Sequence, residues 1–155
     1  ATVPEEIVVA VARMAESVRS THVLRSNIAP DLPKLFVDPR ATAEAVFNLV
    51  QNAAKYSPAG SKIMIAAEAS GEKIRFSVED EGVGIPGDQR EAVFERFYRS
   101  ENSKSGLGMG LAIARGIIEG QGGKIWVESG TKGSKFVFEL PAAAYDGKTE
   151  DTRRR

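Results

Sequence analysis

Two hydrophobic periods alternate along this chain. In three stretches apolar residues recur every three or four positions, which predicts amphipathic helices. In five shorter stretches, bounded by glycine, proline or serine, they alternate with polar residues, which predicts strands. The expected helices span 4–19, 38–57 and 106–119, and the expected strands span 23–28, 63–67, 74–78, 124–129 and 135–140. Residues 35–37 form a further short apolar run, and 91–98 are expected to be irregular or briefly helical.

Capping and turn residues separate these elements. Asp38 is a favourable helix N-cap with Pro39 at the first helical position, and the Pro58-Ala59-Gly60 run ends that helix. Short turns at 70–71 and 130–133 join neighbouring strands into hairpins. Hairpins and intervening helices predict a mixed, mostly antiparallel sheet covered on one face by three helices. The expected fold class is α+β, a two-layer α/β sandwich.

Composition narrows the possible functions. The 155 residues contain no cysteine, which excludes disulfides, a thiol nucleophile and thiolate metal sites. Since the single histidine, His22, cannot form a histidine metal cluster, that class of site is also excluded. The 21 basic and 21 acidic residues balance, which argues against a broad nucleic-acid or membrane surface. No apolar run reaches the ~18 residues of a membrane span. We expect one domain over 1–141 and a disordered tail over 142–155.

The helix expected over 38–57 carries an unusual polar face. Its buried stripe comprises Val46, Leu49, Val50 and Ala53. Another face presents two amides, an ammonium and a phenol at i, i+4, i+7 and i+8, namely Asn48, Asn52, Lys55 and Tyr56. An amide oxygen suits Mg²⁺ and a lysine suits phosphate. The alternative is an ordinary solvated face with Tyr56 at the edge of the core, and this helix alone leaves both open.

Two glycine-rich loops are the other candidates for ligand contact. Asp80 follows a strand and precedes Gly82 and Gly84, so the backbone can approach a ligand closely while the carboxylate accepts hydrogen bonds. Glycines at 106, 108 and 110 open a helix, whose N-terminal N–H groups favour phosphate. Each loop alone is equally consistent with a plain turn. The dinucleotide-binding fingerprint is not met, because a polar loop precedes Gly106 in place of a strand.

Taken together and in order, four segments become specific. Residues 48–58, 80–86, 94–99 and 106–113 resemble the four sequence boxes of the ATP-binding catalytic domain of bacterial sensor histidine kinases. The resemblance covers about residues 4–141, including the strand after Gly122-Gly123 and the turn at Gly133. It implies a fold of the Bergerat (GHKL ATPase) type, with ATP held between the helices and a mobile lid.

The resemblance also implies roles for individual residues. Asn52 is similar to the Mg²⁺ ligand, Asn48 to a supporting residue of the phosphate and metal network, and Asp80 to the acceptor of the adenine amino group. Lys55 would contact phosphate and Tyr56 would line the nucleotide. The lid would contribute hinges at Gly82 and Gly84, phosphate contacts from Arg96, Arg99 and Lys104, and a cradle of Gly106, Gly108 and Gly110. Ile85, Leu107 and Leu111 complete the expected ATP-binding set.

The implied activity is transfer of the γ-phosphoryl group of ATP to a histidine of a separate dimerisation and phosphoacceptor domain of the same full-length kinase. A response regulator would be an indirect partner. Related ATPases, and serine kinases acting as anti-sigma factors, carry a glutamate base where this chain has Asn48, and an amide cannot serve as a base. Those enzymes, and a nucleotide-binding module that only regulates a partner, remain the alternatives. The implied location is cytoplasmic, with inner-membrane anchoring of the full-length protein left open.

His22 and two departures from the family pattern complete the prediction. The segment starting at His22 superficially resembles the family's acceptor box but lacks its acidic neighbour and proline, and it lies 30 residues before Asn52. We therefore expect a surface or strand-end histidine and an acceptor outside this sequence. Gln121 replaces a histidine in a slot that we expect to be structural. Lys135 replaces a threonine, which puts a water-mediated adenine contact from that turn in doubt.

Overall fold

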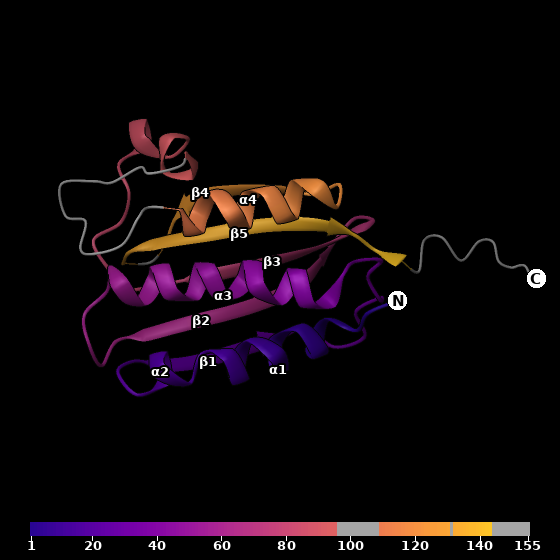
Figure 1. The fold of residues 1–155 in the computed structure, drawn as a ribbon, viewed down its shortest axis with the longest axis horizontal. Helices are drawn as coiled ribbons and strands as arrows, with labels where there is room; N and C mark the ends of the chain where they lie inside the picture. Colours follow the sequence, from indigo (N-terminus) through magenta and orange to yellow (C-terminus); the bar gives the residue numbers. More distant parts are fainter. Residues whose placement is uncertain (96–108, 131, 144–155) are drawn as a thin grey trace, which may run out of the picture.

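A computed structural model of the chain describes residues 1–95, 109–130 and 132–143. Its sheet has five strands in the order β1-β2-β3-β5-β4, with the helices on one side (Figure 1). The helices are α1 (Pro4–Met14), α2 (Glu16–Arg19), α3 (Pro39–Lys55) and α4 (Gly110–Gly120). The strands are β1 (Val23–Ile28), β2 (Lys62–Ser70), β3 (Lys73–Glu79), β4 (Lys124–Ser129) and β5 (Ser134–Pro141), and the 3-10 turns are η1 (Gly87–Gln89) and η2 (Ala92–Phe94).

The sheet is mixed, as expected. β1 and β2 are parallel, whereas β2–β3, β3–β5 and β4–β5 are antiparallel. The chain reaches β2 from β1 through the long helix α3, a crossover that parallel pairing requires. α1, α3 and α4 cover one face, which confirms the two-layer α+β fold predicted from the hydrophobic periods.

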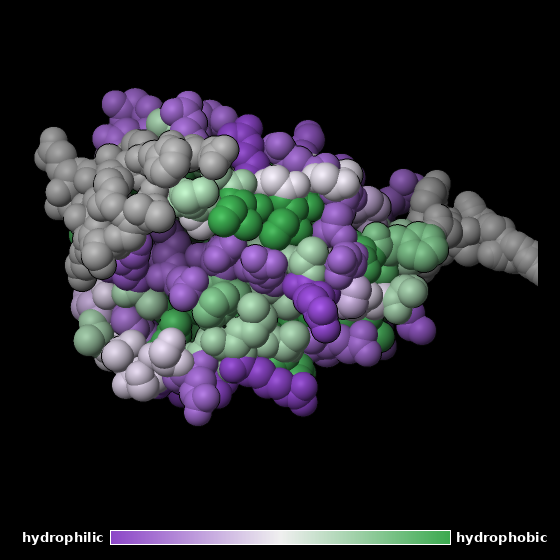
Figure 2. Space-filling model, viewed as in Figure 1, coloured by the Kyte–Doolittle hydropathy of each residue, from purple (hydrophilic) through white to green (hydrophobic). Residues whose placement is uncertain are grey.

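The core lies between the helices and the inner face of the sheet. Phe76 of β3 and Phe138 of β5 stack at 5.0 Å between ring centroids, in register across the strands. All four residues of the predicted α3 stripe are at most 1% exposed. On the outer surface of the helical layer, apolar side chains gather over α4 and a polar strip follows α3 (Figure 2). α3 therefore turns apolar residues to the sheet and polar ones outward.

The first expected helix, over 4–19, is interrupted. α1 ends at Met14, and α2 begins at Glu16 after a non-helical Ala15 (φ −97°, ψ 28°). The buried spacing nevertheless continues through Ala15 (0% exposed) to Val18 (6%). The apolar period thus identified the buried face correctly, although it did not reveal the break.

The N-terminus of α3 is capped locally and is also hydrogen-bonded to a segment distant in sequence. At its N-terminus the Asp38 carboxylate accepts hydrogen bonds from the N–H groups of Arg40 and Ala41, which confirms the predicted N-cap. Gln121, after α4, accepts from Asp38 N–H at 2.7 Å and donates to the Thr42 hydroxyl at 3.0 Å. The expected structural role of Gln121 is therefore a side-chain bridge between α3 and the end of α4.

The expected apolar run at 35–37 forms part of a small cross-connection. Leu35 is fully buried and makes isolated β-bridges with Thr2 and Ala142, while the next residue, Phe36, is 64% exposed. The chain stays hydrogen-bonded to the domain through Ala143, whose N–H donates to Lys34 O. Among the described helices, none is both long and apolar enough to cross a membrane.

A candidate nucleotide-binding site

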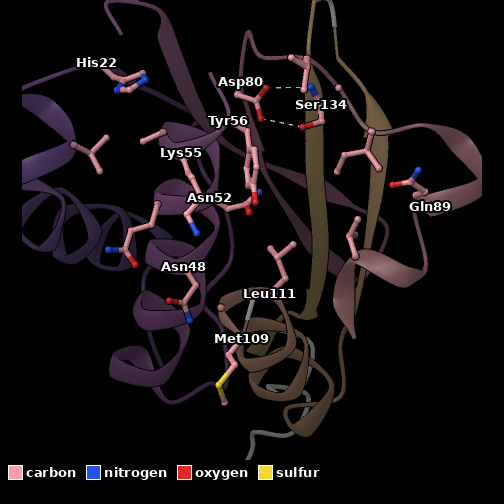
Figure 3. A pocket seen from close by; sticks show the side chains of 18 of the residues that line it. His22, Asn48, Asn52, Lys55, Tyr56, Asp80, Gln89, Met109, Leu111 and Ser134 are labelled. Atoms are coloured by element: carbon pink, nitrogen blue, oxygen red, sulfur yellow. Dashed lines mark hydrogen bonds between the residues drawn. The ribbon is translucent and has the colours of Figure 1, made fainter. Parts of the chain in front are cut away.

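A cavity of about 860 Å³ opens beside α3. Its walls come from α3, the start of α4, the loop after β3, the start of β5 and the junction of α2 with β1. Figure 3 shows Asn48, Asn52, Lys55 and Tyr56 along one side, Met109 and Leu111 opposite, and Asp80 with Ser134 at one end. The helical period and the strand ends therefore bring two of the predicted loops and the polar face of α3 into one site.

The polar face of α3 lines this cavity, which favours the ligand-facing interpretation of the helix over a face turned to bulk solvent. Asn48, Asn52, Lys55 and Tyr56 are all partly buried and all lie in its wall. Among the described residues, the amide groups of Asn48 and Asn52 have no hydrogen-bond partner. The Lys55 ammonium lies 5.9 Å from the Tyr56 ring centroid and has no ion pair within those residues. These groups are available to a ligand.

Asp80 is the most buried charged group of the site, at 3% exposure. Its Oδ1 accepts from the N–H groups of Gly82 (2.8 Å) and Ser134 (3.2 Å). Its Oδ2 accepts from the Ser134 hydroxyl at 2.9 Å. A carboxylate oxygen can accept two hydrogen bonds, so Oδ2 retains one acceptor position. Asp80 is held rigidly and can still accept a hydrogen bond from a ligand.

Two glycines make this packing possible. A Cβ at Gly82 would lie 2.1 Å from the Tyr56 carbonyl oxygen, and one at Gly133 would lie 2.3 Å from Asp80 Oδ1. Since both contacts are with backbone or a fixed carboxylate, a side chain at either position would displace Asp80 or α3. Gly84, in contrast, has φ +79°, which favours glycine for its backbone conformation. Close packing therefore requires glycine at positions 82 and 133, whereas the backbone conformation favours glycine at position 84.

Ser134 and Gly133 are site residues that the sequence reasoning missed. Lys135 in place of threonine put a water-mediated adenine contact from this turn in doubt, and the structure shows that the preceding residue, Ser134, brings a hydroxyl to Asp80. Neighbouring residues of a strand point to opposite faces, so a shift of one residue exchanges the cavity side for the far side of the sheet. The Gly133-Ser134 pair at the start of β5 was the available signal.

The opposite wall is only partly described. Gly110 faces α3, where a Cβ would come within 3.9 Å of the Asn48 side chain, and Leu111 and Ile85 contribute apolar surface to the cavity. The expected lid residues Arg96, Arg99, Lys104, Gly106, Leu107 and Gly108 lie outside the described residues.

His22 lies at the end of the cavity near α2. It is 9% exposed, so the surface location is wrong, whereas the strand-end location is confirmed, because β1 begins at the next residue. Its Nδ1 lies 2.9 Å from the Thr21 hydroxyl and its Nε2 lies 3.3 Å from the Ser57 carbonyl oxygen. Both ring nitrogens are therefore engaged within the fold.

Comparison with known proteins decides the family. A sequence model described as histidine kinase-, DNA gyrase B-, and HSP90-like ATPase matches residues 37–144. The chain belongs to this ATPase family. Within this ATPase family, the chain is 41% identical over 122 residues to the adaptive-response sensory kinase SasA of Nostoc sp., covering 76% of the chain and 30% of the relative. It is 37% identical over 126 residues to SasA of Synechococcus elongatus, a match that covers 79% of the chain and 33% of the relative. The chain thus spans about a third of the length of these relatives.

Solved structures agree with the sequence relatives. The mycobacterial sensor histidine kinase MprB has a TM-score of 0.79 at 29% identity, covering 89% of this chain and 94% of that one. The catalytic domain of histidine kinase ThkA has a TM-score of 0.76 at 31% identity, covering 89% and 92%. Full-length ShkA, solved in complex with AMPPNP, has a TM-score of 0.79 at 28% identity, covering 92% and 31%. The chain is an ATP-binding catalytic domain of the sensor histidine kinase type.

Proposed function

We propose that this domain binds Mg²⁺-ATP in the cavity beside α3 and transfers the γ-phosphoryl group to a histidine on a separate dimerisation and phosphoacceptor domain. A response regulator would receive the group afterwards. The observation that carries the proposal is the row of polar groups on α3, formed by Asn48, Asn52 and Lys55, which line the cavity without a hydrogen-bond or ion-pair partner among the described residues. Phosphoryl transfer depends mainly on positioning and charge neutralisation, which amides, an ammonium and a metal can provide.

Asn52 is the proposed Mg²⁺ ligand, with Asn48 supporting the same network. The residues fit this role, because both amides are partly buried in the cavity wall and lack partners among the described residues. An amide oxygen is a hard, neutral donor of the kind that Mg²⁺ accepts, usually together with water and substrate phosphates. Bound Mg²⁺ would supply charge neutralisation at the phosphates, while Lys55 contacts the phosphate oxygens directly.

The base would lie at the Asp80 end of the cavity. The remaining acceptor position of Oδ2 matches the amino group of adenine, which supports ATP as the preferred nucleotide. Tyr56, Ile85 and Leu111 would line the nucleotide from the sides. Gly82 and Gly84 would serve as one hinge of a lid, and Gly110 would be the last residue of the second hinge.

The remaining lid assignments follow from the family resemblance alone. Arg96, Arg99 and Lys104 would neutralise the terminal phosphates, and Gly106, Leu107 and Gly108 would close over them. The family relationship, the ATP site and the sequence relatives support an acceptor domain as the partner. We propose that this domain is located in the cytoplasm. We also propose that it contacts neither nucleic acid nor membrane.

The residue at position 48 distinguishes a phosphoryl-transfer enzyme from an ATP-hydrolysing one. Asn48 cannot remove a proton from water, so hydrolysis lacks a base at this point of the cavity. To test transfer, the domain, Mg²⁺ and γ-labelled ATP are mixed with an added histidine-hairpin domain from a related kinase. We expect acid-labile label on the hairpin and none on a hairpin whose histidine is replaced by glutamine. Appreciable ATP hydrolysis without transfer would establish the ATPase alternative instead.

A variant of the metal ligand tests the site itself. Asn52→Ala is expected to abolish Mg²⁺-dependent transfer, because it removes the proposed protein ligand from the cavity wall. Asn27→Ala, on the exposed edge of β1, is the matched asparagine control and should transfer at the wild-type rate. The measurement is initial transfer rate against Mg²⁺ concentration. Wild-type turnover by Asn52→Ala would refute the metal assignment.

A further inference from the structure

We infer that His22 is a positioning residue for the base and ribose end of the nucleotide cavity, acting through the turn that carries Tyr56. The inference rests on the proposed placement of the nucleotide. It begins from the burial of the chain's single histidine in the cavity wall and from its two side-chain contacts. In Figure 3 the His22 ring lies on the same side of the cavity as Lys55 and Tyr56.

The hydrogen bonds of His22 connect two elements that are far apart in sequence. A carbonyl oxygen only accepts, so the contact with Ser57 O requires a hydrogen on Nε2. In the neutral ring Nδ1 is then an acceptor that lies 2.9 Å from the Thr21 hydroxyl, whose one hydrogen is shared between this nitrogen and Val18 O at 3.2 Å. The Nε2–H tautomer therefore allows one hydrogen bond to fasten the start of β1 to the turn after α3.

The turn after α3 is held by several further bonds. The Ser57 hydroxyl donates to Ala53 O at 2.7 Å, and Gly60 N–H donates to Thr21 O at 2.7 Å. On the other side, Gly82 packs directly against the Tyr56 carbonyl. Tyr56 thus lies between the His22 anchor on Ser57 and the loop that carries Asp80. Loss of the anchor would loosen the Tyr56 turn where it contacts this loop.

A nucleotide series distinguishes this role from a general structural one. His22→Ala should weaken adenosine, ADP and ATP by the same factor, up to about fivefold, because binding would have to re-order a turn that one hydrogen bond of about 1 kcal/mol otherwise holds in place. Lys55→Ala should weaken ADP and ATP but leave adenosine unchanged. Gln121→Ala removes a comparable side-chain bridge at the opposite end of α3 and should bind all three as the wild type does. Binding is measured by NMR titration at a temperature where circular dichroism shows every variant folded.

A conservative variant tests the hydrogen bond itself. His22→Gln can place an amide N–H near the position of Nε2, and we expect it to recover most of the lost adenosine affinity. If the glutamine variant is as weak as the alanine variant, the hydrogen-bond role is overturned. Wild-type adenosine affinity in His22→Ala overturns the whole inference. Failure of the wild-type domain to bind any adenine nucleotide would instead refute the proposed function, so the two failures are distinguishable.

The single histidine also provides a direct spectroscopic readout. Its two ring nitrogens give unambiguous ¹⁵N signals in labelled protein, because no other imidazole is present. We expect the free domain to show the Nε2–H tautomer and adenosine to shift the Nε2 signal. The opposite tautomer, or signals unmoved by saturating adenosine, would contradict the inference independently of the variants.

Discussion

Asp80 combines burial with a defined set of partners. Two backbone N–H groups, of Gly82 and Ser134, fix Oδ1, and the Ser134 hydroxyl lies against Oδ2. A carboxylate has no hydrogen to donate, so every group that approaches it must be a donor. The amino group of adenine is a donor at the position where guanine has a carbonyl oxygen. The chemistry of one side chain can therefore select the base.

Replacing Asp80 by asparagine should weaken the selection of adenine over guanine. The amide oxygen would be retained by the N–H groups of Gly82 and Ser134, which turns the NH₂ group toward the base. A donor there faces the donor of adenine but matches the oxygen of guanine. We expect the preference for ATP over GTP to fall at least about tenfold, since hydrogen bonds to charged groups contribute about 1.5–3 kcal/mol. A competition titration measures it, and an unchanged preference would contradict the assignment.

At the scale of elements, the polar face of α3 depends on how the helix is anchored. Its N-terminus is capped by Asp38 and bridged to the end of α4 by Gln121, and its C-terminal turn is bound by His22. α4 packs alongside, with Gly110 close to Asn48. These contacts fasten both ends of α3 to neighbouring parts of the fold.

Removing the Gln121 bridge should lower the free energy of unfolding and leave nucleotide affinity largely unchanged. Gln121→Ala deletes one acceptor and one donor bond, which predicts a loss of about 1–2 kcal/mol in the free energy of unfolding. Gln51→Ala, at an exposed position of α3, is the matched control and should change it by less than about 0.5 kcal/mol. Urea unfolding measures both. Equal stability of the two variants would show that the bridge contributes nothing.

The outer face of the sheet carries a cross-strand ion pair between Arg75 of β3 and Glu139 of β5. The atoms Nη2 and Oε2 lie 2.6 Å apart, and the Ser70 hydroxyl donates to the same oxygen at 3.2 Å. Burial by itself raises the pKa of Glu139. The hydrogen bond and charge of Arg75, with smaller contributions from Ser70 and Lys73, outweigh it and hold the pKa below the ordinary value.

The lowered pKa of Glu139 sets the pH at which this pair matters. A depressed carboxyl pKa stabilises the fold above the unfolded value of about 4.3, and the contribution is lost as the pH falls through the folded value. Glu139→Gln should therefore lower stability at pH 7 by up to about 1 kcal/mol, because Arg75 is 39% exposed and partly screened. The difference should shrink toward pH 3 in urea unfolding. Glu44→Gln, at an exposed site, should show no such dependence, and a gap that persists at pH 3 would contradict the prediction.

At the scale of the whole molecule, the cavity joins parts of the chain that are far apart in sequence. Its walls include residues near positions 22, 52, 80, 110 and 134, so a bound ligand would contact both helices and the sheet. A ligand that binds only the folded state stabilises it by mass action. Nucleotide binding and global stability should therefore be coupled.

Adenine nucleotides should raise the melting temperature of the domain. At 100 times the dissociation constant, ATP would add about 2.7 kcal/mol to the free energy of unfolding, an increase of several degrees. Differential scanning calorimetry with ATP, ADP and GTP measures this shift. GTP at the same concentration should give a clearly smaller rise. Equal shifts for ATP and GTP would contradict base selection by Asp80.

Local periodicity was sufficient for much of the fold and for part of the site. Helical spacing places Asn48, Asn52 and Lys55 on one face irrespective of the rest of the molecule, and strand alternation with turn residues identifies both hairpins. Long-range packing was needed for the remainder. The Asp80 contact with Ser134 spans 54 residues, and the His22 contact with Ser57 spans 35.

The errors have the same origin. At the start of β5, attention went to Lys135 at the family's threonine position, and only the pairing with β3 shows that Ser134 faces Asp80. His22 was expected at the surface or at a strand end, because neither its burial nor its contact with Ser57 follows from its neighbours in the chain. Residue order alone thus specifies which chemical groups each element carries. Which groups meet, and at what depth, depends on the register and packing of elements distant in sequence, because those set burial and hydrogen-bond partners.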